Sequence, residues 1–318
     1  MTAIHASRKV SDAAIFGKVA VLMGGNSSER DVSLKSGTAV LAALKAQGVD
    51  AWGVDGKDDV LPQLQQNGFD RVFVVLHGRG GEDGVIQGAL ETIGMPYTGS
   101  GVLGSALGMD KLRCKQLWQG MGLPTANFAV LDSGSDFAAV AQQLGLPLIV
   151  KPASEGSSIG MSKVSDPAQL AHAVRVAAEL NDCVIAEQWI SGAEYTVAVL
   201  ADEALPAIRL ETPNEFYDFE AKYQTDTTRY HCPCGLSTER EAELKHLSLK
   251  AFASVGASGW GRVDVMADEA GHFYLLEVNT VPGMTDHSLV PMAALAAGLS
   301  FEDLVWRVLE VSLDGGDK

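Results

Sequence analysis

The sequence predicts a multidomain α/β protein, and three observations support this prediction. The chain has 318 residues, which suits two or three packed subdomains better than one ordinary core. In the first hundred residues an apolar strand, a glycine-rich loop and a helix follow one another, which is typical of parallel α/β units. The later residues contain a second, smaller α/β module and then a pair of strands flanked by helices.

The first unit is expected to begin after a flexible extension, residues 1–17. Three short apolar runs predict its strands: residues 18–23, 51–54 and 72–76. The first run leads into the glycine-rich loop 24–29 and then into a helical pattern, and the third ends in a second glycine-rich loop, 77–84. Ligands bind in loops at this end of parallel strands. Loop 24–29 lacks the G-x-G-x-x-G spacing, which argues against a dehydrogenase.

A change of composition near Gly99 predicts the first domain boundary, close to residue 108. The smaller module is predicted to contain two helices, at residues 109–121 and 167–180, and two strands, at residues 148–151 and 184–187. The last part is predicted to contain a helix at residues 239–254, strands at residues 261–266 and 273–279, and a helical region at residues 288–313. Between these parts lies the polar segment 212–235, which is too long for an ordinary connector and is expected to be a lid or binding loop.

The net charge of the chain indicates which classes of partner it can bind. The chain has 24 Lys and Arg against 40 Asp and Glu, a formal net charge of −16, which opposes broad binding to nucleic acid or anionic lipid. No apolar run reaches membrane-spanning length, and the first residues do not resemble a secretion signal. We therefore expect a cytoplasmic protein that binds small molecules, and neither nucleic acid nor membrane.

The two late strands carry the most informative side chains. Because alternate residues of a strand share a face, Arg262 lies beside Asp264, and Glu277 lies beside Asn279 on the neighbouring strand. Two carboxylates and one amide, without thiol or imidazole, suit Mg²⁺ bound together with substrate phosphates. Taken alone, such a face is more often solvated and holds ordinary ion pairs.

Two lysines and a loop could meet the phosphates. Lys111 begins a predicted helix and Lys151 ends an apolar strand, and the loop 155–160 offers free backbone N–H groups. The lysine precedes the glycines, so the loop is not a Walker A motif, and alone it is more often a surface turn. Trp189 and Ile190 could form a wall for a purine, although core packing is equally compatible with them.

Taken together, this order of residues resembles the ATP-grasp ligases, and within them the D-alanine–D-alanine ligase family. The resemblance covers nearly all residues from 18 to about 313. It is specific, because many motifs stand in the order of the family: residues 24–33, 76–84, 97–101, 109–111, 261–264, 277–280 and 282–285.

The resemblance implies an α/β fold of the ATP-grasp type. It divides the chain into an N-terminal Rossmann-like substrate domain, 18–108, and two ATP-grasp subdomains, 109–198 and 199–318, which clamp ATP beneath the lid loop 212–235. It implies ligation of two D-alanine molecules to D-alanyl-D-alanine through a D-alanyl phosphate, for peptidoglycan precursor synthesis. It also implies a homodimer formed through the first domain.

The resemblance also implies roles for individual residues. Glu29 and His77 correspond to contacts of the first D-alanine, and Ser158 and Tyr223 to the hydrogen bonds that tie the lid to the other domains. Arg262 and the backbone of Gly283 correspond to the groups that stabilise the tetrahedral intermediate. The turn that receives the second D-alanine corresponds to Ser288 and Leu289.

Further positions correspond to the nucleotide and metal contacts of the family. Asp264, Glu277 and Asn279 are implied as ligands of two Mg²⁺ ions, for which Mn²⁺ is an expected substitute. The residues implied in ATP binding are Lys111, Lys151, Glu155, Ser157, Ser158, Glu187, Gln188, Trp189, Ile190, Glu194 and Lys222.

Two alternative functions were weighed against this one. A D-alanine–D-lactate ligase would differ at the lid tyrosine, whereas Tyr223 is similar to that of dipeptide-forming enzymes. A non-catalytic nucleotide-binding regulator would be expected to lack at least one residue of the set Lys151, Arg262, Glu277 and Asn279, and this chain has all four.

Overall fold

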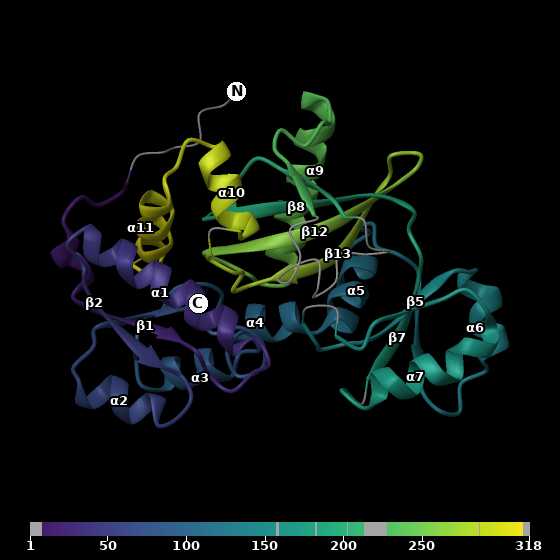
Figure 1. The fold of residues 1–318 in the computed structure, drawn as a ribbon, viewed down its shortest axis with the longest axis horizontal. Helices are drawn as coiled ribbons and strands as arrows, with labels where there is room; N and C mark the ends of the chain where they lie inside the picture. Colours follow the sequence, from purple (N-terminus) through teal and green to yellow (C-terminus); the bar gives the residue numbers. More distant parts are fainter. Residues whose placement is uncertain are drawn as a thin grey trace.

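The computed structural model describes residues 8–156, 159–181, 183–201, 203–212, 228–285 and 287–313. The strands in these ranges form three sheets (Figure 1). In the view of Figure 1, the sheet built from the first residues lies on the left, the largest sheet in the centre and a four-stranded sheet on the right. The α/β class expected from the sequence is confirmed.

The first sheet is parallel, with strand order β2-β1-β3. Its strands are β1 (Lys18–Met23), β2 (Asp50–Asp55) and β3 (Arg71–Val74), and its helices are α1 (Arg30–Ala46), α2 (Val60–Gln66) and α3 (Val85–Thr92). The three strands predicted from the sequence are confirmed. Because β1 and β3 are parallel neighbours, the loops that follow them emerge at the same edge of the sheet.

The four-stranded sheet is antiparallel, with strand order β4-β7-β5-β6. It consists of β4 (Phe128–Leu131), β5 (Leu148–Pro152), β6 (Ser162–Val164) and β7 (Val184–Gln188), with α6 (Phe137–Leu144), the short 3-10 helix η2 (Pro167–Gln169) and α7 (Leu170–Ala178). The sequence predicted β5, β7 and α7. It missed β4, β6 and α6, which are short and lack a long hydrophobic period.

The largest sheet has the order β11-β10-β8-β12-β13, with β9 paired to β8. Its strands are β8 (Gly192–Leu200), β9 (Glu203–Ala204), β10 (Ile208–Glu211), β11 (Arg229–His231), β12 (Trp260–Asp268) and β13 (Phe273–Asn279). All pairings are antiparallel, and α9 (Thr238–Ser254) packs on one face. The predicted pairing of the two late strands is confirmed, with Arg262 opposite Asn279 and Asp264 opposite Glu277.

Helices α4 (Val102–Met109) and α5 (Lys111–Gly120) connect the sheets. Cys114 and Trp118 of α5 are buried in the core of the largest sheet, and Thr125 forms a bridge to Leu275 of β13. The expected boundary at residues 198 and 199 falls inside β8, all of which belongs to the largest sheet. Packing therefore places α5 and β8 with the largest sheet, and the four-stranded sheet with its helices spans residues 128–188.

The chain returns to its first unit at the end. Helices α10 (Leu289–Ala296) and α11 (Phe301–Val311) belong to one hydrophobic core with the first sheet. In Figure 1 they lie above α1 on the left of the molecule. Among the described residues, no single helix is long and apolar enough to span a membrane, and α10 with α11 meets that test only as a pair bent by 106°.

Residues 8–17 form a packed segment, which we call the N-terminal strap, and not the loose extension that the sequence suggested. The short 3-10 helix η1 (Ala13–Phe16) buries Phe16, whose ring lies edge-on to Trp306 at 5.0 Å. The backbone N–H of Val10 donates to Glu310 at 2.9 Å, and Trp306 donates to the same carboxylate at 2.9 Å. The strap was missed because its two anchors, Val10 and Phe16, are too few to give a periodic pattern.

The strap yields a prediction about stability. Phe16→Ala should lower the free energy of unfolding by about 3–5 kcal/mol, because it removes a fully buried ring from a packed core. The neighbouring Ile15 is 51% exposed, so Ile15→Ala should change stability by no more than about 0.5 kcal/mol. Thermal unfolding of both variants measures the difference. Equal midpoints would show that the strap does not stabilise the fold.

Candidate active site

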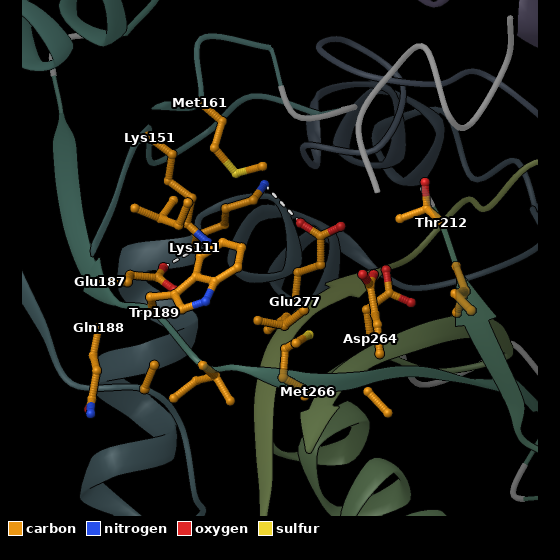
Figure 2. Close-up of a pocket in the computed structure, with 18 of the residues that line it drawn as sticks. Lys111, Lys151, Met161, Glu187, Gln188, Trp189, Thr212, Asp264, Met266 and Glu277 are labelled. Carbon is orange, nitrogen blue, oxygen red and sulfur yellow. Dashed lines mark ion pairs between the residues drawn. The ribbon is translucent and has the colours of Figure 1, made fainter. Parts of the chain in front are cut away.

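A cavity of about 490 Å³ lies between the four-stranded sheet and the largest sheet, a volume typical of small-molecule sites (Figure 2). Side chains of β5, β7, β8, β12 and β13 line it, together with the first residue of α5. Ten residues singled out from the sequence are among its walls: Lys111, Lys151, Glu155, Glu187, Gln188, Trp189, Ile190, Glu194, Asp264 and Glu277.

The acidic wall of the cavity comes from β12 and β13. Asp264 and Glu277 are register partners, and both line the cavity. Arg262 donates two hydrogen bonds to Asp264, from Nε at 2.8 Å and from Nη2 at 2.7 Å. Thr196 of β8 donates to the same carboxylate at 2.7 Å, and the amide of Asn279 at 3.2 Å. The structure thus brings together all four late-strand residues that the sequence singled out.

The oxygen atoms of these side chains indicate which kind of metal ion could bind here. Within the described ranges, no group of three or more His, Cys, Asp or Glu side chains could hold a metal ion by itself. Asp264 and Glu277 supply two carboxylates, and Asn279 adds an amide oxygen. Mg²⁺ is commonly bound by one or two carboxylates plus substrate phosphates, so the residues fit a metal shared with a nucleotide.

Lys111 connects the acidic wall to the start of the loop 155–160. Its Nζ lies 3.1 Å from a carboxylate oxygen of Glu277 and donates to the carbonyl oxygen of Glu155 at 2.7 Å. Burial disfavours the ammonium form, but the facing carboxylate of Glu277 outweighs this effect and raises the pKa of Lys111. Arg79 pairs with Glu155 at 3.2 Å, which ties the same loop to the first unit.

Lys151 faces a buried carboxylate at the opposite wall. Its Nζ lies 2.7 Å from Glu187, and the Nζ of Lys115 lies 3.1 Å from the other oxygen of that carboxylate. Burial raises the pKa of the Glu187 carboxyl, but the two lysines outweigh it and the net shift is downward. Burial lowers the pKa of Lys115, against the attraction of Glu187. Glu187 is 3% exposed, faces the two lysines and lines the cavity, and its contact with a base stays a prediction.

Lys115 is a residue that the sequence analysis missed. It stands one helical turn after Lys111 on a helix whose other buried residues include Leu112, Cys114 and Trp118. A lysine at i+4 on the buried face of a helix is unusual and requires a partner. That signal was present in the sequence but was not used.

One wall of the cavity is aromatic and apolar. Trp189 and Ile190 line it, and the ammonium of Lys163 lies 4.3 Å from the centre of the Trp189 ring. In Figure 2 the side chain of Gln188 points away from the labelled lysines, and its carbonyl oxygen accepts a hydrogen bond from Asn127 at 3.2 Å. The oxygen of the Gln188 side chain is therefore engaged with Asn127, and both Gln188 and Glu194 belong to the cavity lining.

Glu29 and His77 are buried beside each other at the edge of the first sheet. The Nδ1 of His77 lies 2.8 Å from the carbonyl oxygen of Val281, and burial lowers the pKa of the imidazole while Glu29 opposes that shift. Glu82, which was not singled out individually, is close enough for burial and Glu29 to raise its pKa to about 8. A Cβ on Gly156 would lie 3.0 Å from a Glu29 oxygen, so the backbone at Gly156 lies directly beside this carboxylate.

The turn before α10 is held against α1. The N–H of Met284 donates to Ser36 at 3.0 Å, and Ser288 accepts from the N–H of Thr285 at 2.9 Å. A Cβ on Gly283 would lie 2.8 Å from the Ser288 hydroxyl, so the close approach requires glycine. The side chain of Leu289 is buried in the core.

Four of the predicted site residues lie outside the described residues: Ser157, Ser158, Lys222 and Tyr223. Of the expected lid, 212–235, the structure describes Thr212, which lines the cavity, and residues 228–235, which include β11.

Comparison with known sequences identifies relatives over the whole chain. The family models described as D-ala D-ala ligase N-terminus and D-ala D-ala ligase C-terminus match residues 54–100 and 117–310. A D-alanine–D-alanine ligase of Nitrosococcus oceani is 62% identical over 303 residues, which cover 95% of this chain and 96% of that protein. One of Stutzerimonas stutzeri is 61% identical over 317 residues and covers both chains completely.

Solved structures agree with the sequence relatives. The crystal structure of a D-alanine–D-alanine ligase from Bacillus anthracis has a TM-score of 0.82 at 33% identity and covers 93% of this chain and 97% of its own. The same enzyme complexed with ATP also has a TM-score of 0.82, at 31% identity and the same coverage. Both comparisons lead to one conclusion: the chain belongs to the D-alanine–D-alanine ligase family.

Proposed function

We propose that this chain ligates two D-alanine molecules to D-alanyl-D-alanine with ATP, through a D-alanyl phosphate, in the cytoplasm, for peptidoglycan precursor synthesis. The observation that carries the proposal is the convergence of three walls on one cavity: lysines from α5 and β5, carboxylates from β12 and β13, and an aromatic wall after β7. The relatives named D-alanine–D-alanine ligase and the related structure complexed with ATP support it.

In this proposal the nucleotide lies along the cavity. The base stacks beside Trp189 and Ile190, with Glu194 for the ribose, and the phosphates extend toward Lys151 and Lys111. The glycine-rich loop, with Ser157 and Ser158, supplies backbone and hydroxyl donors, and Lys222 of the lid adds a further cation. Positive charges on both sides of the triphosphate offset the repulsion that the acidic chain would otherwise exert.

Two Mg²⁺ ions, or Mn²⁺ in their place, would be held by Asp264, Glu277 and Asn279. When bound, the ions neutralise the phosphate oxygens during phosphoryl transfer. The arrangement fits because the two carboxylates are adjacent in register and face the same cavity as the lysines.

The reaction has two steps on this account. A carboxylate oxygen of the first D-alanine attacks the γ-phosphorus, ADP leaves, and Glu29 with His77 holds the amino acid in line. The neutral amine of the second D-alanine, received at Ser288 and Leu289, then attacks the acyl carbon. The bond from that carbon to the phosphate oxygen breaks, and phosphate leaves with the proton that the amine gives up. Arg262 and the N–H of Gly283 stabilise the developing oxyanion.

Water would hydrolyse the acyl phosphate, so the site must close during the reaction. We propose that the segment 212–235 is the lid, and that Tyr223 and Ser158 connect it with Glu29. In this proposal the first unit, 18–108, binds the amino acid, and the four-stranded sheet and the largest sheet clamp ATP between them.

The proposed activity can be tested directly. Purified protein with ATP, Mg²⁺ and D-alanine should release phosphate and form D-alanyl-D-alanine, identified by mass from a mixture of D- and L-amino acids, while D-lactate should be a poor acceptor. Efficient depsipeptide formation would favour a D-alanine–D-lactate ligase. ATP binding without D-alanine-dependent turnover would favour a non-catalytic regulator.

The role of Glu277 gives a second test. Glu277→Gln should lower kcat by about 100-fold or more, because metal stabilisation of a phosphoryl transfer is worth several kcal/mol. Glu269→Gln is the matched control, since Glu269 is exposed in the turn that joins the same two strands. Activity is compared after thermal unfolding has shown that both variants fold. Near-normal turnover of Glu277→Gln would exclude it as a ligand.

We further propose a homodimer formed through the first unit. Val85 at the start of α3 and Leu103 at the start of α4 are each 66% exposed, and apolar side chains gathered in this way often mark an interface. Leu103→Glu should therefore shift the mass measured by light scattering from dimer to monomer. Leu295→Glu, at an equally exposed leucine of α10, should leave it unchanged. A monomeric unmodified protein would contradict the proposal.

A further inference from the structure

We propose that Lys115 is a positioning residue for the triphosphate: it offsets the charge of Glu187, so that Lys151 faces the cavity as a net cation. This inference rests on the proposed binding of ATP in the cavity. It assigns a role to a side chain that does not line the cavity and that the sequence did not single out.

Helix α5 places two lysines on one face. Lys111 and Lys115 are four residues apart, so their side chains project in the same direction. Lys111 pairs with Glu277 of β13, and Lys115 pairs with Glu187 of β7. One helix thus supplies a counter-charge to the acidic residue in each of two opposing walls.

The charges around Glu187 do not cancel. The group consists of one carboxylate between two ammonium groups, Lys115 and Lys151, and carries a net charge of +1. The Lys115 side chain is fully buried, Glu187 is nearly so, and Lys151 retains 11% of its side-chain surface. The surplus positive charge is therefore available at Lys151, which lines the cavity, and not at Lys115.

Without Lys115, the same carboxylate would pair with Lys151 alone. A phosphate approaching Lys151 would then meet a neutral ion pair, and binding it would leave Glu187 buried without a full counter-charge, which is costly. With Lys115 in place, Glu187 keeps a buried partner while Lys151 turns to a phosphate. Lys115 also donates to Thr125 at 2.8 Å, and Thr125 donates to the carbonyl oxygen of Leu275 at 2.9 Å, which fixes the ammonium in place.

Lys115 would make the same contacts if its only role were to hold the helix and the strands together. The test must therefore separate the effect of its charge from the effect of its packing. Lys115→Met keeps most of the length of the side chain and removes its charge. Affinity for a non-hydrolysable ATP analogue should fall by about tenfold or more, as expected for one lost charge near the phosphates, and KM for ATP should rise in parallel. Affinity for adenosine, which has no phosphate, should stay within about twofold of the unmodified protein.

The double variant Lys115→Met/Glu187→Gln restores the net charge of +1, now carried by Lys151 alone. It should recover most of the lost affinity for the analogue, whereas a structural role would make it weaker than the single variant. Because it leaves no unpaired buried carboxylate, this variant tests the inference even if Lys115→Met alone does not fold.

Thr125→Val is the packing control. It removes the hydrogen bond to Lys115 but keeps the charge, so affinity for the analogue should stay within about twofold while the thermal midpoint falls. If the unmodified protein does not bind the analogue, the proposed function itself fails. If it binds but Lys115→Met binds equally well, or if the double variant shows no recovery, the role of Lys115 is refuted and the proposed function stands.

Discussion

The pairing of buried charges around α5 is the constraint on which the site depends. Ionised side chains can be buried only when a partner stands close by, because removal from water costs several kcal/mol per ion. Here Lys111 meets Glu277 on one side, and Lys115 meets Glu187 on the other. Helix α5 packs against the largest sheet, and the Lys115–Glu187 pair connects it to β7 of the four-stranded sheet. Buried ion pairs therefore contribute to the walls of the cavity beside apolar packing.

The same principle explains why an acidic chain can accept a polyanion. The formal net charge is −16, yet the lysines nearest the cavity outnumber the carboxylates that neutralise them on the β5 side, where one Glu187 serves two lysines. On the β13 side the charges balance, because Arg262 pairs with Asp264 and Lys111 pairs with Glu277, and the two neighbouring carboxylates suit a divalent cation. A nucleotide with metal ions carries negative phosphates and positive ions. The β5 side would face the phosphates, and the β13 side would face the metal ions.

The fold could be predicted from the sequence where hydrophobic patterns were long or where motifs were specific. Strands β1, β5 and β12 stand out as apolar runs, and the alternation at Arg262 and Asp264 indicated which side chains share a face. Short elements such as β4 and β6 gave no such pattern. The partners of Glu187 could not be predicted, because they lie on a helix more than sixty residues away and on a neighbouring strand. The strap was missed because its few apolar residues form no periodic pattern, and its partners, Trp306 and Glu310, lie far away in the sequence.

The return of α11 to the first sheet has a consequence for how the chain folds during synthesis. The core that holds β1 and β3 also contains Trp306, Val308 and Leu309, which are synthesised long after these strands. The strands of the parallel sheet precede α11 in the chain, so part of their apolar face lacks its native cover until α11 has been made and has packed against it. The N-terminal third therefore does not supply the whole of its own core.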